Sequence, residues 1–165
     1  DALQVFYGIK FILLVTLPEV LHGVAARHLP VFDGDYSPES GWNQAQAILA
    51  RRGEFTAVFC ANNFIAYGAI RAFREAGIRV PDDISVVAFD DLPEEWSADP
   101  FLTVARQPAY EIGRTAATLL LDRITGTHRP KGESIVLASE LIIRRSSAPP
   151  HHVEAGQPRQ FHPIA

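Results

Sequence analysis

The chain has 165 residues, 47% of them apolar by a broad count and 21% charged. This is enough for one domain, or for one lobe of a larger domain followed by a tail. The 15 Lys and Arg against 19 Asp and Glu give a net charge of −4, which excludes a broad basic surface for nucleic-acid phosphates. The single cysteine, Cys60, excludes a disulfide framework and a cysteine-rich zinc site. This composition is typical of a cytoplasmic α/β domain.

The apolar stretch over residues 3–17 does not indicate a membrane segment. It is shorter than the roughly 20 residues of a membrane span. Lys10 interrupts it, and it lacks the charged leader and the small-residue cleavage site of a signal peptide. Residues 11–15 form a continuous aliphatic and β-branched run, which predicts a buried strand. No membrane association is expected.

Strands and helices are predicted to alternate along the rest of the chain. Ser37 followed by Pro38 predicts a helix start, with a hydroxyl cap and a proline in the first turn. Gly53 and Gly77 suit the left-handed conformation that often follows a helix. The expected elements are a helix from Pro38 towards Gly53, a strand over 56–61, a helix from Asn62 or Asn63 to Gly77, a strand over 84–89, a helix over 111–124 and a strand over 134–143.

This alternation predicts an α/β fold with a parallel sheet flanked by helices. Ligands of such sheets bind beyond the carboxyl ends of the strands. Asn62 and Asn63 follow one predicted strand, and Asp90 and Asp91 follow the next. Carboxylates and amides can bind the hydroxyl groups of a ligand. These positions are therefore candidates for a binding site.

No catalytic or metal-binding arrangement is found in the sequence. Adjacent carboxylates such as Asp90 and Asp91 point to opposite sides of an extended strand. There is no nucleophile elbow and no glycine-rich phosphate loop after a strand. His151 and His152 have no third ligand nearby and lie in a segment, 147–165, that we expect to be a flexible Pro- and His-rich tail. We expect a non-enzymatic domain over residues 1–146, without a metal or cofactor.

Five sequence blocks, in order and with natural spacing, resemble the effector-binding part of the LacI/GalR family of bacterial transcriptional regulators. The resemblance covers residues 34–147, in the blocks GDYSPESGW, TAVFCANNFIAYGAIRAFREAGIRVPDDISVVAFDD, LTVARQP, EIGRTAATLLLDRITG and ELIIRRSS. It implies a periplasmic-binding-protein-like fold of type I, with two α/β lobes and a small effector between them. This chain corresponds mainly to the C-terminal lobe.

The resemblance implies the ligand-sensing domain of a repressor that binds a sugar or a nucleobase. Asp90 falls on the family's effector-binding aspartate, and Asn62 on its asparagine after the preceding strand. Tyr36 stands where the family often stacks a ring on a sugar, and Gln107 lies at the crossover between the lobes. Each residue also has a purely structural alternative: a turn cap for Asp90, a helix cap for Asn62, a half-buried ring for Tyr36 and a hinge position for Gln107.

The resemblance also implies a homodimer, whose interface would include Ala66, Tyr67, Ile70 and Arg71. Operator DNA would be bound by a helix-turn-helix domain that is not in this chain. The helix over 111–124 packs on the first lobe in the family. Here its apolar face, formed by Ile112, Ala116, Leu119 and Leu120, is expected to fold back onto the sheet or to pair with another chain.

Two further interpretations stay open, one because of three departures from the family pattern and the other because of the shared fold. Val20 stands in place of an effector-binding arginine, Asn63 in place of an aspartate and Val104 in place of a threonine. An isopropyl group cannot replace a guanidinium fork. The chain could therefore be a remnant that has lost effector binding. A sugar-binding component of a transporter would share the same fold and is the other alternative.

Overall fold

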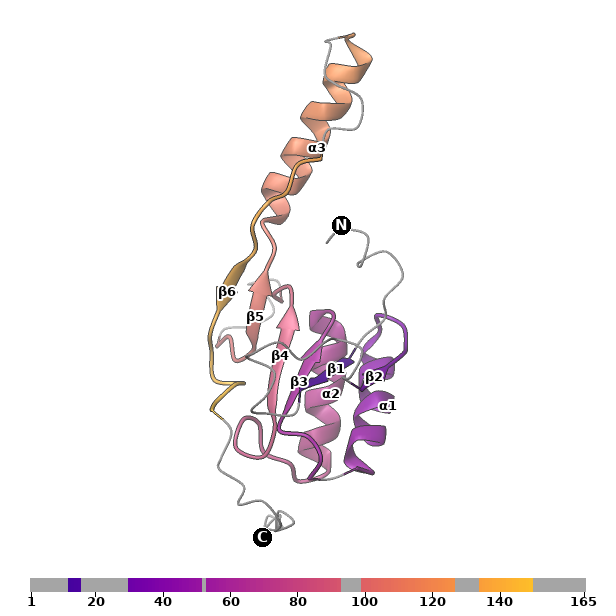
Figure 1. Cartoon of the computed structure of the whole chain (residues 1–165), viewed down its shortest axis with the longest axis vertical. Coiled ribbons are helices and arrows are strands. Elements are labelled where there is room, and N and C mark those ends of the chain that lie inside the picture. The colour runs from indigo at the N-terminus through magenta and orange to yellow at the C-terminus, as the bar shows by residue number, and fades with distance from the viewer. Residues whose placement is uncertain (1–11, 16–29, 52, 93–98, 127–133, 150–165) are drawn as a thin grey trace.

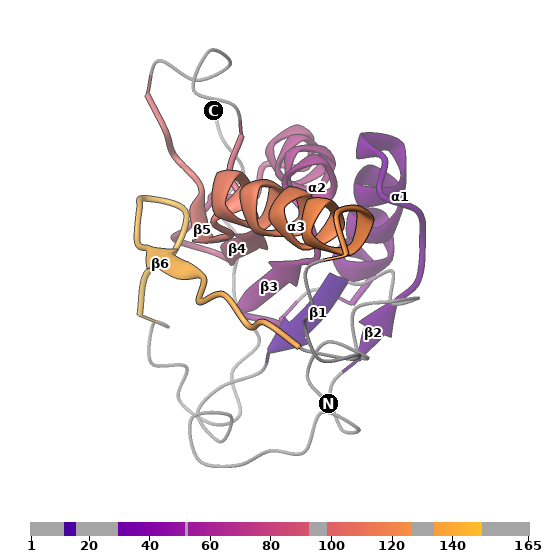
Figure 2. The same cartoon turned by 90° about the horizontal axis from the view of Figure 1, so that it is seen from above.

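The computed structural model describes residues 12–15, 30–51, 53–92, 99–126 and 134–149. In this part, six strands and three helices follow one another. Their bounds are β1 Ile12–Val15, β2 Val31–Phe32, α1 Pro38–Leu49, β3 Ala57–Cys60, α2 Asn63–Glu75, β4 Ser85–Phe89, β5 Thr103–Arg106, α3 Ala109–Ile124 and β6 Glu140–Ile142. Helices α1 and α2 lie side by side on the sheet, whereas α3 extends away from it (Figures 1 and 2).

The six strands form one sheet in the order β2-β1-β3-β4-β5-β6. The central strands β3, β4 and β5 are parallel. The alternation of strands and helices predicts this for β3 and β4, whereas β5 was not among the expected elements. The outer strands β1, β2 and β6 pair antiparallel with their neighbours, so the sheet is mixed around a parallel centre. The strand predicted over residues 11–15 is present as β1 but belongs to this antiparallel part.

The apolar core lies between the sheet and the helices α1 and α2. Along β3 and β4, side chains that are fully buried, such as Val58, Cys60 and Ala88, alternate with half-buried ones, such as Phe59 and Val87. From the continuous apolar runs we expected strands whose two faces are equally buried. The described helices α1 and α2 cover one face only, which accounts for the alternation (Figure 2).

The ends of several elements differ from the sequence-based expectation. Ser37 caps α1 by accepting the Ser40 amide at 3.1 Å, but α1 ends at Leu49, and Gly53 (φ +89°) belongs to the turn beyond it. Gly77 (φ +72°) follows α2 as predicted. Helix α3 begins at Ala109, ahead of the predicted start. The last strand is confined to Glu140–Ile142.

Helices α1 and α2 cross at two glycines. A Cβ on Gly41 would lie 2.1 Å from the Ile65 carbonyl oxygen, and one on Gly68 would lie 1.9 Å from that of Pro38. Only glycine permits such a close approach of two backbones. The crossing lies near the amino ends of both helices and so fixes the distance between Ser37 and Asn62, their N-cap residues.

The chain returns to the sheet after β6 and stays packed as far as Ala148. Ser146 is fully buried: its amide donates to the Phe101 carbonyl, and its carbonyl accepts the Val86 amide. Its hydroxyl donates to the Val86 carbonyl at 2.6 Å. The Ala148 amide and carbonyl both bond to the Ser85 hydroxyl. The packed region therefore extends past the expected boundary at residue 146. Residues 150–165 of the expected tail lie outside the described part.

No side chain of α3 is buried. Its exposed apolar residues include Tyr110, Ile112, Leu120, Leu121 and Ile124. The expectation that this face folds back onto the sheet is wrong, because α3 projects away from it (Figure 1). The second possibility, pairing with another chain, stays a prediction. Within the described ranges, no helix combines the length and the apolar character needed to cross a bilayer.

Candidate functional site

Three of the predicted ligand residues directly follow the parallel strands. Asn62 lies after β3, Asp90 after β4, and Gln107 after β5. The fourth, Tyr36, immediately precedes the N-cap of α1. Because parallel strands end at the same edge, all four lie around the carboxyl edge of the sheet, where ligands of α/β sheets bind.

Asp90 and Gln107 are in direct contact. The Gln107 Nε2 atom donates to Asp90 Oδ2 at 2.7 Å, and Asp90 Oδ1 accepts the Asp91 amide at 2.9 Å. The Asp90 amide donates to the Ala105 carbonyl at 2.9 Å. Asp90 has a φ of +70°, a left-handed conformation that is uncommon for residues other than glycine. Asp90 thus serves as the turn cap that the sequence left open, while its carboxylate keeps acceptor sites for a ligand.

Asn62 and Tyr36 form the second pair. Asn62 Oδ1 accepts the Ile65 amide at 2.8 Å and caps α2, which settles the choice between Asn62 and Asn63. Its Nδ2 atom donates to the Tyr36 carbonyl at 3.2 Å. An amide nitrogen has two N–H groups, so one remains for a ligand. The Tyr36 side chain is 48% exposed, and its ring offers a face to an apolar surface.

Asn63 connects the two ends of the site. It is buried at the start of α2, and its Nδ2 atom donates to the Asp91 carbonyl at 2.6 Å. A charged aspartate, which the family resemblance leads one to expect at this position, could not donate this bond. Asn63 therefore supplies a donor that ties the loops after β3 and β4 together.

Arg144 is a further residue of the site that the sequence did not reveal. Its guanidinium donates to both carboxylate oxygens of Asp91, at 2.8 and 2.5 Å. The two side chains are only 17% and 19% exposed. The hydrogen bonds from Arg144 hold the pKa of Asp91 below its ordinary value, against the opposing effect of burial. The only sequence signal was the pair of adjacent arginines, Arg144 and Arg145, after the last strand. Nothing in the sequence indicated that Asp91 is the partner of Arg144.

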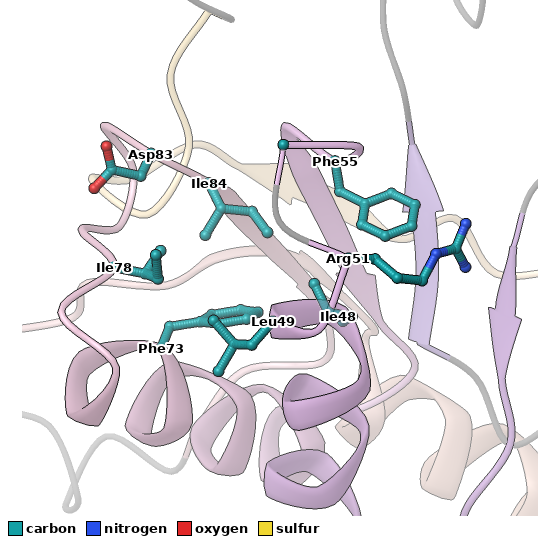
Figure 3. Close-up of a pocket in the computed structure, with 9 residues that line it drawn as sticks. Ile48, Leu49, Arg51, Phe55, Phe73, Ile78, Asp83 and Ile84 are labelled. Carbon is teal, nitrogen blue, oxygen red and sulfur yellow. The ribbon is translucent and has the colours of Figure 1, made fainter. Parts of the chain in front are cut away.

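The hollow drawn in Figure 3 lies at the opposite edge of the sheet. Its lining includes Ile48, Phe55, Phe73 and Ile84, which precede β3 and β4 or end the helices. Its cavity volume is about 20 Å³, room for about one water molecule. This hollow is too small for a sugar or a nucleobase.

Cys60 is fully buried in β3, and burial raises the pKa of its thiol. A neutral thiol in an apolar core is a weak nucleophile. Among the described residues, no group of three or more His, Cys, Asp or Glu side chains is placed to bind a metal ion. Val20, at the position of the family's arginine, lies outside the described residues.

Of the four residues expected at a dimer interface, only some are accessible to a partner. Tyr67 is 58% exposed, and Arg71 is exposed as well, whereas Ile70 is half-buried. Ala66 is fully buried in the core of this chain, so its side chain cannot contact a partner. Ala66 lies on the buried face of α2 together with Ala69 and Phe73, which follow it three and seven positions later.

The fold and the polar carboxyl edge define a periplasmic-binding-protein-like domain. The family model described as a periplasmic binding protein-like domain matches residues 21–147. The HTH-type transcriptional repressor PurR of Erwinia tasmaniensis is 43% identical over 126 residues, which cover 76% of this chain and 37% of PurR. The chain therefore spans less than half the length of this relative.

Solved structures give the same assignment. A LacI family transcriptional regulator from Enterococcus faecium with bound ribose superposes with a TM-score of 0.65 at 30% identity, over 79% of this chain and 48% of that one. The dimeric Lac repressor with an 11-residue C-terminal deletion superposes with a TM-score of 0.64 at 34% identity, over 72% and 43%. The chain belongs to the periplasmic binding protein-like family and, within it, forms part of a LacI/GalR effector-binding domain. The relatives named are regulators and do not favour the transporter alternative.

Proposed function

We propose that this chain is a ligand-sensing part of a cytoplasmic, LacI-type transcriptional repressor and has no enzymatic activity. The observation that carries the proposal is the hydrogen-bonded pair of Asp90 and Gln107 at the carboxyl edge of the parallel strands. The named relatives are transcriptional regulators, one of them solved with bound ribose, and ligands of parallel α/β sheets bind at this edge.

The proposed effector is a sugar or a nucleobase. Asp90 would accept hydrogen bonds from hydroxyl or N–H groups, and Gln107 would supply both a donor and an acceptor. The exposed ring of Tyr36 would stack on the apolar face of a pyranose or on a base. Asn62 would add its second amide N–H.

Regulation would follow from a shift in the population of lobe arrangements on effector binding. We propose a homodimer that contacts its partner through Tyr67, Ile70 and Arg71. Operator DNA would be bound by a helix-turn-helix domain outside this sequence, which agrees with the net charge of −4.

A thermal-shift screen tests effector binding, because a ligand that binds only the folded state raises its melting temperature. The probes are D-ribose, lactose, D-galactose, hypoxanthine and guanine. We expect at least one probe to stabilise the wild-type chain and the Asp82→Ala variant but not Asp90→Ala. Asp82 is an exposed carboxylate before β4, at the opposite edge of the sheet. Equal stabilisation of Asp90→Ala would refute the site. The absence of any shift would support the remnant interpretation.

A further inference from the structure

The orientation of Asp90 is imposed by its surroundings. Aspartate adopts a left-handed backbone more readily than most residues, and in Asp90 its own Oδ1 accepts the Asp91 amide at 2.9 Å, so neighbouring contacts decide whether this conformation is kept. The Asp90 amide is held by the Ala105 carbonyl, which fixes the residue on the β5 side. The next residue, Asp91, is held by other partners.

Asp91 is held at both its backbone and its side chain. Asn63 donates to its carbonyl oxygen at 2.6 Å, and the guanidinium of Arg144 binds both carboxylate oxygens. Asp91 Oδ1 also accepts the Leu92 amide at 3.0 Å. With Asp91 fixed in this way, the backbone between β4 and Asp91 leaves Asp90 directed towards Gln107.

Arg144 is itself fixed to the start of β5. Its Nη1 atom donates to the Leu102 carbonyl at 2.9 Å, and its amide donates to Thr103 Oγ1 at 2.8 Å. It belongs to the segment that returns to the sheet after α3 and β6. The side chain therefore links this returning segment to the loop that carries Asp90.

We propose that Arg144, acting through Asp91, is a positioning residue for the effector-facing carboxylate of Asp90. Arg144 does not contact the effector in this proposal. It holds Asp91, and Asp91 in turn keeps Asp90 in the left-handed conformation that brings its carboxylate to Gln107. The functional meaning of this contact rests on the proposed function, whereas the contact itself is testable without a ligand.

The test follows two signals by NMR in the wild-type chain and in variants. These are the side-chain amide resonances of Gln107 and the hydrogen exchange of the Asp90 amide. Arg144→Gln removes the guanidinium fork, and Arg144→Lys keeps the charge but not the bidentate geometry. Arg145→Gln is the matched control, because the adjacent Arg145 pairs with Asp99 on an exposed surface. Ile48→Val controls for a general loss of stability, since Ile48 lies at the opposite edge of the sheet.

We expect Arg144→Gln to shift the Gln107 resonances towards those of a free amide and to speed exchange at Asp90 about tenfold or more. Arg144→Lys should fall between this variant and the wild type. Both controls should leave the Gln107 resonances unchanged. An unchanged Gln107 signal in folded Arg144→Gln or Arg144→Lys would overturn the proposal.

Adding ligands distinguishes a failure of this inference from a failure of the proposed function. D-ribose and hypoxanthine are added to the wild type and to Arg144→Lys. If neither binds the wild type but the Gln107 signal still depends on Arg144, the proposed function fails and the positioning role stands. If a probe binds both proteins equally tightly and the signal does not change, the positioning role fails and the proposed function stands.

Discussion

The side-chain amide of Gln107 donates a 2.7 Å hydrogen bond to the carboxylate of Asp90, 17 positions earlier in the chain. Asp90 directly follows the strand β4, and Gln107 lies where the chain leaves β5 for α3. The contact therefore joins the proposed effector-reading carboxylate to the segment that leads into α3. An effector that binds Asp90 would meet this segment at the same point.

This contact makes the site sensitive to a second negative charge. In Gln107→Glu, two carboxylates would face each other, and their repulsion would raise the pKa of one of them. A raised native pKa lowers stability at neutral pH, and protonation relieves the loss as the pH falls through the raised value. We expect Gln107→Glu to be less stable than Gln107→Leu at pH 7, by about 1 kcal/mol, and the gap to close towards pH 4. Urea unfolding across this range measures it, and a gap independent of pH would contradict the contact.

Much of the fold follows from local sequence signals. Ser37 and Pro38 give the start of α1, Gly77 gives the end of α2, and the apolar run before Asp90 gives β4. These features depend on a few neighbouring residues and on backbone preferences that any context preserves. The parallel pairing of β3 with β4 follows from the alternation of strands and helices, whereas β5 was not predicted from the sequence.

What the sequence did not provide are the contacts between distant residues. Asp91 and Arg144 lie 53 positions apart, and no periodicity relates them. The burial of Ser146 likewise depends on its insertion between β4 and β5. The resemblance to a family gave Asp90, Asn62, Tyr36 and Gln107 as candidate ligand residues, but their common place at one edge and their hydrogen bonds required the structure.

The crossing of α1 and α2 should tolerate no added side-chain atoms. Gly41→Ala and Gly68→Ala would place a methyl group within about 2 Å of a backbone carbonyl oxygen, so we expect each to destabilise the chain by about 1–3 kcal/mol. Gly113→Ala is the control, since a Cβ at Gly113 in α3 meets nothing within 4 Å. It should stabilise the chain by up to about 1 kcal/mol. Chemical unfolding compares the three variants, and a similar effect in all three would argue against the close crossing.

The Asp91–Arg144 pair should contribute to stability only above the range in which carboxyl groups become protonated. The native pKa of Asp91 is lowered by Arg144 from an ordinary value of 3.8. The contribution is therefore complete well above that value and is lost as the pH falls through the lowered native pKa. We expect Asp91→Asn to cost about 1–3 kcal/mol at pH 7, and the difference from the wild type to shrink below about pH 4.

Unfolding curves of the wild type and Asp91→Asn at a series of pH values measure this difference. Asp99→Asn provides the control, because its pair with Arg145 is exposed, with 78% of the Asp99 side chain accessible. Exposed pairs contribute little, so the difference in stability between this variant and the wild type should hardly change with pH. A constant difference for Asp91→Asn down to pH 3 would contradict the assigned direction of the pKa shift.

The bare apolar face of α3 should cause association between chains. Leu120 is 60% exposed and Ile112 is 42% exposed, and clustered apolar surface of this kind favours contact with a partner. We expect the average mass from light scattering to rise with protein concentration, and Leu120→Glu to reduce this rise. Thr118→Glu, on another side of the helix, should leave it unchanged. A monodisperse monomer whose α3 amides exchange rapidly would contradict the prediction.

The most direct test of the central claim is an NMR titration of the chain with D-ribose and with hypoxanthine, observed at the backbone and side-chain amides. The account predicts saturable shifts, for at least one of the two probes, at the amides of Asp90, Asn62 and Gln107. Residues around the hollow of Figure 3, such as Ile48 and Ile84, should stay unshifted. Shifts confined to that opposite edge, or no saturable shift with either probe, would contradict effector binding at the carboxyl edge of the sheet.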